Sequence, residues 1–168
     1  MIESTKGQIF SVDMILAAIV FLFIITSTIV FSNEINNNVI LAEKDNLRKE
    51  TAITAASALV YSSGSPANWE NLADLNNVSS IGIAKTRNFL DSEKVSKLVD
   101  LNQTNYSAVK YLLGVSKYGL KISVLNLQDK SVLAEFGLEP ESDDSVSAVN
   151  RFAYYNGQDV LIRVKVFE

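Results

Sequence analysis

The chain has 168 residues, a net charge of −4 and neither Cys nor His. The missing Cys removes disulfides and thiol nucleophiles, and the missing His removes the commonest general base and the commonest transition-metal ligand. The 15 Lys and Arg residues are scattered, so nucleic acid is not expected as a partner. We expect no enzyme, no catalytic or metal-binding residues and no cofactor. An enzyme would need several carboxylates or a Ser and Lys pair converging in a cleft, which spacing alone does not show.

An apolar segment without charge covers residues 14–31. A membrane-spanning helix needs about 20 apolar residues, and residues 9–12 together with Ser32 extend the segment to that length. We predict a membrane span over about residues 9–32. A cleaved secretory signal would have a shorter apolar region followed by small residues at a cleavage site, which residues 32–35 do not provide. Any processing is therefore expected before the apolar segment.

No Gly or Pro occurs between Gly7 and Gly64, so nothing in this stretch forces a helix to end. We predict one helix over residues 8–63. At about 1.5 Å per residue it would be roughly 80 Å long, against the roughly 30 Å that a membrane requires. The alternative is a break at Asn residues 36–38, which have poor helix propensity. Helical spacing predicts an apolar face in the outer half that contains Ile35, Val39, Ala42, Ile53, Ala56 and Val60.

Residues 64–168 are predicted to form a compact head, because Gly64 and Pro66 favour the end of the long helix. Two short helices are expected, capped by Asp91 or Ser92 and by Thr104 or Asn105. The predicted elements are helices over about 92–99 and 105–114, and strands over 118–127, 132–136, 146–155 and 158–167.

The last two predicted strands are joined by Asn156 and Gly157, which between apolar runs are the strongest short hairpin signal. In residues 158–167, β-branched residues alternate with a largely polar set, which indicates a sheet with one buried face. We expect the outer half of the long helix to pack on that face. The predicted fold class is α+β, with a long N-terminal helix packed on a small head that has an antiparallel sheet and short helices.

Three features at the start of the chain occur together: Lys6, Gly7 and Gln8 precede the apolar segment, Asp13 lies near its start, and the helix continues beyond it. In these features the chain resembles the archaeal type IV pilin-like proteins, whose precursors carry class III signal peptides. Segments 64–70, 81–84 and 90–91 also resemble parts of larger archaeal pilin-like proteins. The resemblance covers the first third of the chain, and the head only in patches.

The resemblance implies that a prepilin peptidase removes residues 1–7 by cutting between Gly7 and Gln8. Members of the family usually have the acid at the fifth mature position, whereas this cut makes Asp13 the sixth. A cut between Gln8 and Ile9 restores the spacing but loses the expected junction. We favour the cut after Gly7.

Asp13 is a costly residue in an apolar segment, since an acid costs up to about 2.5–3.5 kcal/mol at the centre of a membrane helix and less toward an end. Such residues are usually paired. In a filament the partner would be the terminal amine of a neighbouring subunit, and the pair would set the register between subunits. The alternative is an Asp at the membrane surface in contact with water.

The function implied by the resemblance is that of a structural subunit of an archaeal type IV pilus-like surface filament, as a minor rather than a major pilin. Before assembly it would be a single-pass membrane protein with its head outside the cell. The charges near the segment do not decide this orientation. Its implied partners are other pilin subunits through the N-terminal helix, the prepilin peptidase, membrane lipid, and the assembly platform and ATPase. The competing class is a membrane-anchored surface domain that binds a ligand or partner without polymerising.

Three N-glycosylation sequons begin at Asn77, Asn102 and Asn105, a number that chance alone would produce, so ordinary loop and cap residues are the alternative. The acidic residues 139–144 are interpreted as a solvated loop rather than a calcium site, since they lack the turn Gly and distal Glu of such sites. We expect Trp69 to seal the base of the head. Tyr154 and Tyr155 are interpreted as cross-strand packing rather than an adhesive tip.

Overall fold

The computed structural model describes residues 4–168, with side chains from Val12 onward. The fold is α+β and divides into two compact units, Met1–Lys44 and Asp45–Glu168. The first unit is helical, and the second holds the sheet and the short helices. The division falls inside the long helix, because the last turns of that helix belong to the core of the second unit.

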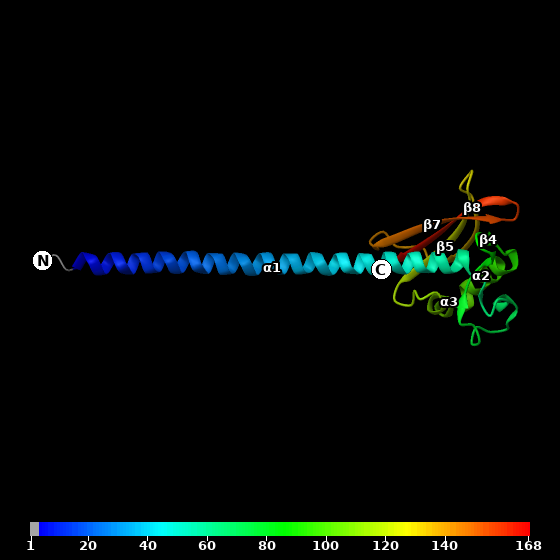
Figure 1. Ribbon diagram of the computed structural model, residues 1–168, viewed down its shortest axis with the longest axis horizontal. Coiled ribbons are helices and arrows are strands. Elements are labelled where there is room, and N and C mark those ends of the chain that lie inside the picture. Colours follow the sequence, from blue (N-terminus) through cyan, green and yellow to red (C-terminus); the bar gives the residue numbers. More distant parts are fainter. Residues whose placement is uncertain (1–3) are drawn as a thin grey trace. The chain divides into compact units, whose positions relative to one another are not determined.

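The long helix α1 spans Ser4–Tyr61 and is drawn from blue to cyan in Figure 1. It continues through Asn residues 36–38, so the alternative of a break there is wrong. Asn costs only a fraction of a kcal/mol per position in a helix, which does not stop a helix that lacks Gly and Pro. The helix begins before the predicted Gln8, and it ends at Tyr61, two residues before the predicted Ser63.

The head unit contains a two-stranded sheet and a six-stranded curled sheet with the strand order β3-β4-β7-β8-β5-β6. All neighbouring strands in the larger sheet are antiparallel except β4 and β7, which are parallel. The bounds are β1 Gly64–Ser65, 3₁₀ helix η1 Trp69–Asn71, β2 Ser80–Ile81, β3 Ala84–Thr86, β4 Phe89–Leu90, α2 Ser92–Thr104, α3 Tyr106–Leu112, β5 Gly119–Asn126, β6 Val132–Gly137, β7 Val146–Tyr155 and β8 Gln158–Phe167.

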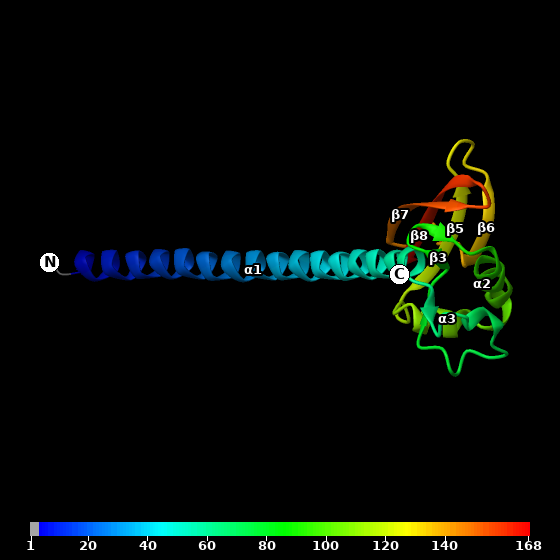
Figure 2. The ribbon, with the colours of Figure 1, turned by 45° about the vertical axis from the view of Figure 1, so that its right-hand side comes forward.

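The core of the head lies between the last turns of α1 and one face of the sheet (Figures 1 and 2), which confirms the predicted packing. The four β-branched residues of β8 are fully buried in the same cluster as the helix residues. The buried helix face consists of Ala52, Ala55, Ala56, Leu59 and Val60.

The predicted apolar face of α1 was only partly right in the head. Ala56 and Val60 are buried as expected, but Ile53 is 47% exposed, whereas Ala52 and Leu59, which lie off the predicted face, are buried. Three of the five buried positions are Ala, and small side chains allow the helix to approach the sheet closely. The sequence prediction gave the larger Ile too much weight.

The β7–β8 hairpin is confirmed with its predicted bounds, and Tyr155 pairs with Gln158 across the turn. Asn156 and Gly157 have φ values of 47° and 85°. Two successive residues with positive φ form the type I′ turn that suits the twist of a hairpin, and Asn and Gly adopt this conformation readily. The turn sequence therefore sets the register of the two longest strands.

Helix α2 begins where predicted, and the side chain of Asp91 caps it by accepting a hydrogen bond from the backbone N of Glu93 at 2.9 Å. It continues to Thr104 instead of ending near Val99. The reason is that buried Leu101 extends the apolar spacing of Val95 and Leu98 by another turn. No Gly or Pro intervenes to stop it.

The short strands β1–β4 were not predicted. Strands of two or three residues are too short to show an alternating pattern, and their pairing depends on distant segments. Strand β4 joins the sheet beside β7 through the pair Phe89 and Tyr154. Strands β3 and β4 extend the larger sheet on the side of β7, whereas β1 and β2 pair with each other in the small sheet.

Candidate membrane and assembly surface of helix α1

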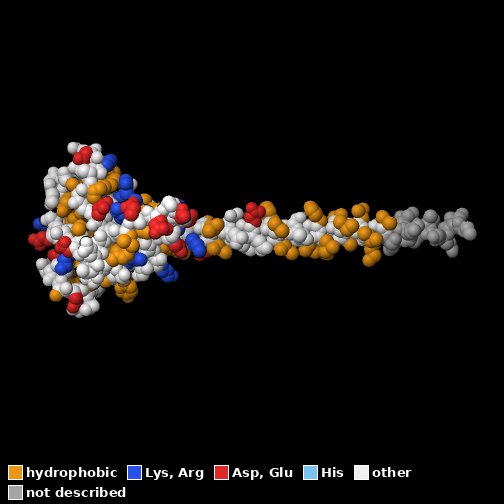
Figure 3. All heavy atoms as spheres, turned by 180° about the vertical axis from the view of Figure 1, so that it is seen from behind, with side chains coloured by type: hydrophobic (Ala, Val, Ile, Leu, Met, Phe, Trp, Pro, Cys, Tyr) orange, Lys and Arg blue, Asp and Glu red, His pale blue; other side chains and the backbone are white. Residues whose placement is uncertain are grey.

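The first part of α1 exposes apolar side chains on all sides. Every residue from Val12 to Lys44 is exposed, and Figure 3 shows apolar side chains along this unit. Between Asp13 and Glu34 there is no charged residue. The helix is long and apolar enough to cross a membrane, and its most apolar stretch is not buried against any other described element. An apolar helix that is exposed all round requires a lipid or protein environment.

Two Thr side chains in this stretch are hydrogen-bonded within the helix. The Thr26 hydroxyl donates to the Leu22 carbonyl, and the Thr28 hydroxyl donates to the Ile24 carbonyl, each at 2.8 Å. A hydroxyl group in hydrocarbon costs several kcal/mol unless it is hydrogen-bonded, and these bonds remove the need for an outside partner. The two Thr residues therefore do not argue against a membrane span.

Asp13 is exposed on α1 beside Val12 and Met14, which are exposed apolar residues. Within the part of the chain that the structure describes, its carboxylate has no ion pair or hydrogen bond. The single chain thus supplies no charge partner for this acid among its described residues.

The predicted cleavage residues Lys6, Gly7 and Gln8 lie within the bounds of α1, but their side chains are outside the described part of the chain. Residues 1–3 of the predicted leader also lie outside the described residues. The cleavage site therefore stays a prediction.

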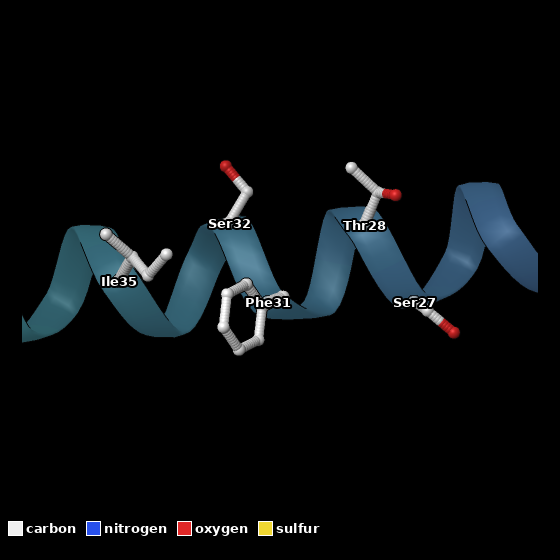
Figure 4. Close-up of a pocket in the computed structure, with 5 residues that line it drawn as sticks. All are labelled: Ser27, Thr28, Phe31, Ser32 and Ile35. Carbon is white, nitrogen blue, oxygen red and sulfur yellow. The ribbon is translucent and has the colours of Figure 1, made fainter.

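A shallow hollow on α1 is lined by Ser27, Thr28, Phe31, Ser32 and Ile35 (Figure 4). All five residues belong to the same helix, so no second element closes the hollow. Ligand sites are concave and enclose most of their ligand. We therefore treat this hollow as part of the exposed helix surface and not as a ligand pocket.

Exposed apolar residues continue beyond the segment that a membrane would cover. Ile35, Val39 and Leu41 are about half exposed or more. In the head unit, Leu47 and Ile53 are also exposed, on turns whose opposite side is buried in the core. Helix α1 therefore exposes apolar residues that neither a membrane over residues 14–31 nor the core of the head would cover.

Two Arg residues attach the helix to β7 within the head unit. Arg48 is 6% exposed, donates from Nε to the Ser147 hydroxyl at 3.2 Å and forms an ion pair with Asp45. Arg151 of β7 donates to the Ser57 hydroxyl at 3.3 Å. These contacts fix the rotation of the last turns of α1 against the sheet.

A buried Lys holds the segment that follows α1. Lys94 of α2 donates from Nζ to the carbonyls of Ser63 and Ala67, at 2.8 and 2.6 Å. A cation near the C-terminal end of a helix is favourable, because the helix dipole leaves partial negative charge there. Nearby, Trp69 is fully buried in the core and donates to the Gly82 carbonyl at 2.9 Å, so it packs inside the head.

Sequence reasoning did not find Arg48 and Lys94 as structural contacts. A signal existed for Arg48, which lies one helical turn before Ala52 and so falls on the buried face. We see no comparable signal for Lys94, because its partners are backbone carbonyls about 30 residues away. Lys and Arg are rarely buried unless they are paired, so residue type alone does not mark either of them as a core contact.

The three sequon residues lie in different surroundings. Asn77 is exposed in the loop before β2, and Asn105 is exposed between α2 and α3. Asn102 lies in the last turn of α2, is half-buried, and accepts a hydrogen bond from the backbone N of Gly137 at 2.7 Å. Asn77 and Asn105 are therefore the accessible sequons, whereas Asn102 holds β6 against α2.

The acidic loop is anchored by its first residue. Glu139 pairs with Lys121 of β5 and, at 2.8 Å, with Lys165 of β8. The Lys121 ammonium, followed by that of Lys165, lowers the pKa of Glu139 from 4.5 to about 2. The hydrogen bond that Lys121 donates to Glu139 raises the pKa of Lys121. Among the described residues, no cluster of acidic side chains is arranged to hold a metal ion.

We expect the melting temperature of the head to vary less with pH below about 4.5 in Glu139→Gln than in the parent. Because folding lowers this pKa, the carboxylate stabilises the head above about pH 4.5, and the contribution is lost as the pH falls toward 2. The melting temperature, followed by Trp69 fluorescence at several pH values, measures this. Glu141→Gln is the control, because Glu141 in the same loop makes no ion pair among the described residues. Equal dependence of the melting temperature on pH in the two variants would contradict the role given to the ion pairs of Glu139.

Comparison of the chain with protein-family models, with curated proteins and with solved structures gives no match.

Proposed function

We propose that this protein is a structural subunit of an archaeal type IV pilus-like surface filament, and a minor rather than a major pilin because of its sizeable head. It is held in the membrane by α1 before assembly. The observation that carries the proposal is the excess of exposed apolar surface on α1. The resemblance at Lys6, Gly7, Gln8 and Asp13 supports it independently.

The length of α1 supports packing against further helices. Residues 12–44 alone rise by roughly 50 Å at about 1.5 Å per residue, while the hydrocarbon core is about 30 Å thick. Ile35, Val39 and Leu41 would lie beyond a membrane that covers residues 14–31. Apolar surface left in water is unfavourable by about 25 cal/mol per Å². Copies of the same helix in a filament would cover these residues together with the membrane segment.

Asp13 supports the same proposal through its charge. It lies at the start of the uncharged stretch and has no partner among the described residues. After cleavage, the free amine of a neighbouring subunit would neutralise it inside the filament. Lipid is already apolar, so moving the helix from lipid into a filament gains little from the hydrophobic effect. Assembly would therefore need work from the platform and ATPase.

A membrane-anchored domain that never polymerises is the competing function. Such a domain needs a helix of about membrane length, and it gains nothing from apolar residues exposed beyond the membrane. Ile35, Val39 and Leu41 therefore favour the filament proposal. The head packs on the last turns of α1 in either case, so this packing does not distinguish the two.

Intact-mass measurement of the protein from its native membrane tests the proposal. We expect a chain that begins at Gln8, with a mass consistent with pyroglutamate formation, because the leader is removed before assembly. A chain that begins at Ile9 would show that the cut lies after Gln8, and it would still support removal of a leader. The same protein made in a host without prepilin peptidase is the control and should retain Met1. Native protein that still begins at Met1 would contradict the proposal.

A further inference from the structure

A hollow lies at one end of the sheet, between the β5–β6 turn and the β7–β8 turn. Its volume is about 330 Å³, within the roughly 300–1,000 Å³ that small-molecule sites occupy. Figures 1 and 2 both show the two turns close together at that end. All of its lining residues belong to β5, β7, β8 and these turns. The hollow is therefore separate from the surface of α1.

One wall of the hollow is a pair of amide side chains. Asn126 accepts a hydrogen bond from the backbone N of Gln128 at 2.8 Å and donates from Nδ2 to Oε1 of Gln158 at 3.1 Å. Among the described residues, Nε2 of Gln158 has no hydrogen-bond acceptor. Asn126 thus holds Gln158 in position at the end of β8, on the face of the sheet opposite to that of Asp159.

Asp159 contributes a free carboxylate to the same hollow. It is exposed, and within residues 12–168 its side chain takes part in no ion pair. None of the residues that line the hollow is basic. The hollow therefore offers acceptors and donors for neutral groups and disfavours an anion.

Tyr154 adds an exposed aromatic ring. It lines the hollow, is 41% exposed and packs against Phe89 with ring centroids 5.5 Å apart. Phe152, two residues earlier on the same face of β7, is 68% exposed. The predicted packing holds for both tyrosines, because Tyr154 packs against Phe89 of the neighbouring strand and Tyr155 packs against the core. Phe89, Phe152 and Tyr154 are also exposed, and we call these three residues the aromatic platform, since exposed apolar patches often mark binding sites.

We propose that the hollow and the aromatic platform bind a neutral carbohydrate. A sugar ring has a face of C–H groups, which packs on an aromatic ring, and a rim of hydroxyls, which donate and accept hydrogen bonds. Tyr154 receives the C–H face, and Asp159, which lies opposite Tyr154 on the same face of the sheet, accepts from hydroxyls. An aliphatic ligand would leave the carboxylate without a partner. The proposal does not depend on filament formation.

The test uses the full chain in phospholipid nanodiscs, which avoids detergents with sugar headgroups. Methyl glycosides of glucose, galactose, mannose and N-acetylglucosamine are titrated while NMR follows the backbone amides of Gly157 and Gln128. We expect at least one glycoside to shift both amides with millimolar affinity. Tyr154→Ala should weaken that binding about tenfold or more, as truncation of a central aromatic contact does.

Two further variants separate loss of contact from loss of folding. Tyr154→Phe keeps the ring and should bind like the parent, and Asp159→Asn should weaken binding with the amide spectrum of the core unchanged. Tyr111→Ala is the matched control, since Tyr111 is 75% exposed on α3 and does not line the hollow. If none of the four glycosides shifts these amides, or if Tyr154→Ala and Asp159→Asn both bind like the parent, the proposal is wrong.

Discussion

The Leu59→Ala variant is expected to lower the free energy of unfolding of the head by about 2–5 kcal/mol. Leu59 is fully buried between α1 and the sheet, in the cluster that includes the inner face of β8. Shortening a buried Leu loses transfer free energy and leaves a cavity that the surroundings fill only in part. Ala is a good helix former, so the change does not act by weakening the helix itself.

The measurement is urea unfolding of the full chain in nanodiscs, followed by the fluorescence of Trp69. Trp69 is the only Trp and is fully buried, so its emission reports the head alone. Ile53→Ala is the matched control on the same helix, and because Ile53 is 47% exposed we expect a change below about 1 kcal/mol. Equal losses in the two variants would show that the buried face of α1 has been assigned wrongly.

The Asp13→Ala variant is expected to insert into the membrane as the parent does and to be absent from filaments. Removing an acid from an apolar helix lowers the cost of insertion, so the membrane fraction should not decrease. In the proposed filament the same change leaves the terminal amine of a neighbour without its partner. An unpaired charge in a packed interior costs about 3–5 kcal/mol, enough to prevent incorporation.

Sedimentation of sheared filaments, with quantification of the subunit in filament and membrane fractions, measures this effect. Glu34→Ala is the control, because Glu34 is also an exposed acid on α1 but lies beyond the uncharged stretch. Asp13→Glu keeps the charge and should restore part of the incorporation. Unchanged filament yield in Asp13→Ala would remove Asp13 from its proposed role.

The sequence predicted those elements whose signals are local. The absence of Gly and Pro through residues 8–63 indicated α1, and Asn156 with Gly157 indicated the hairpin and its register. Asp91 gave the start of α2 because a capping side chain acts within its own turn. In each case the residues that carry the signal are neighbours in the sequence.

The parts that were missed depend on contacts between distant residues. Strand β4 pairs with β7 through Phe89 and Tyr154, which are far apart in the chain, and neither segment alone indicates this pair. The hollow that Tyr154 lines likewise depends on residues of the β5–β6 turn, which are distant in the chain. The helical spacing of apolar residues also placed Ile53 on the buried face, although it is exposed. Such a pattern depends on hydrophobicity and does not show how closely a helix can approach a sheet.

The position of β8 in the sheet has a consequence for biosynthesis. This strand follows every other element along the chain, yet it lies in the middle of the sheet, between β7 and β5. Until β8 leaves the ribosome, β5 and β6 have no hydrogen-bonded link to β7, and the apolar faces of these strands are uncovered. The head therefore emerges as an open chain while α1 is already complete. In the proposed function, the head would cross the membrane unfolded and close its sheet afterwards, which suits this order of synthesis.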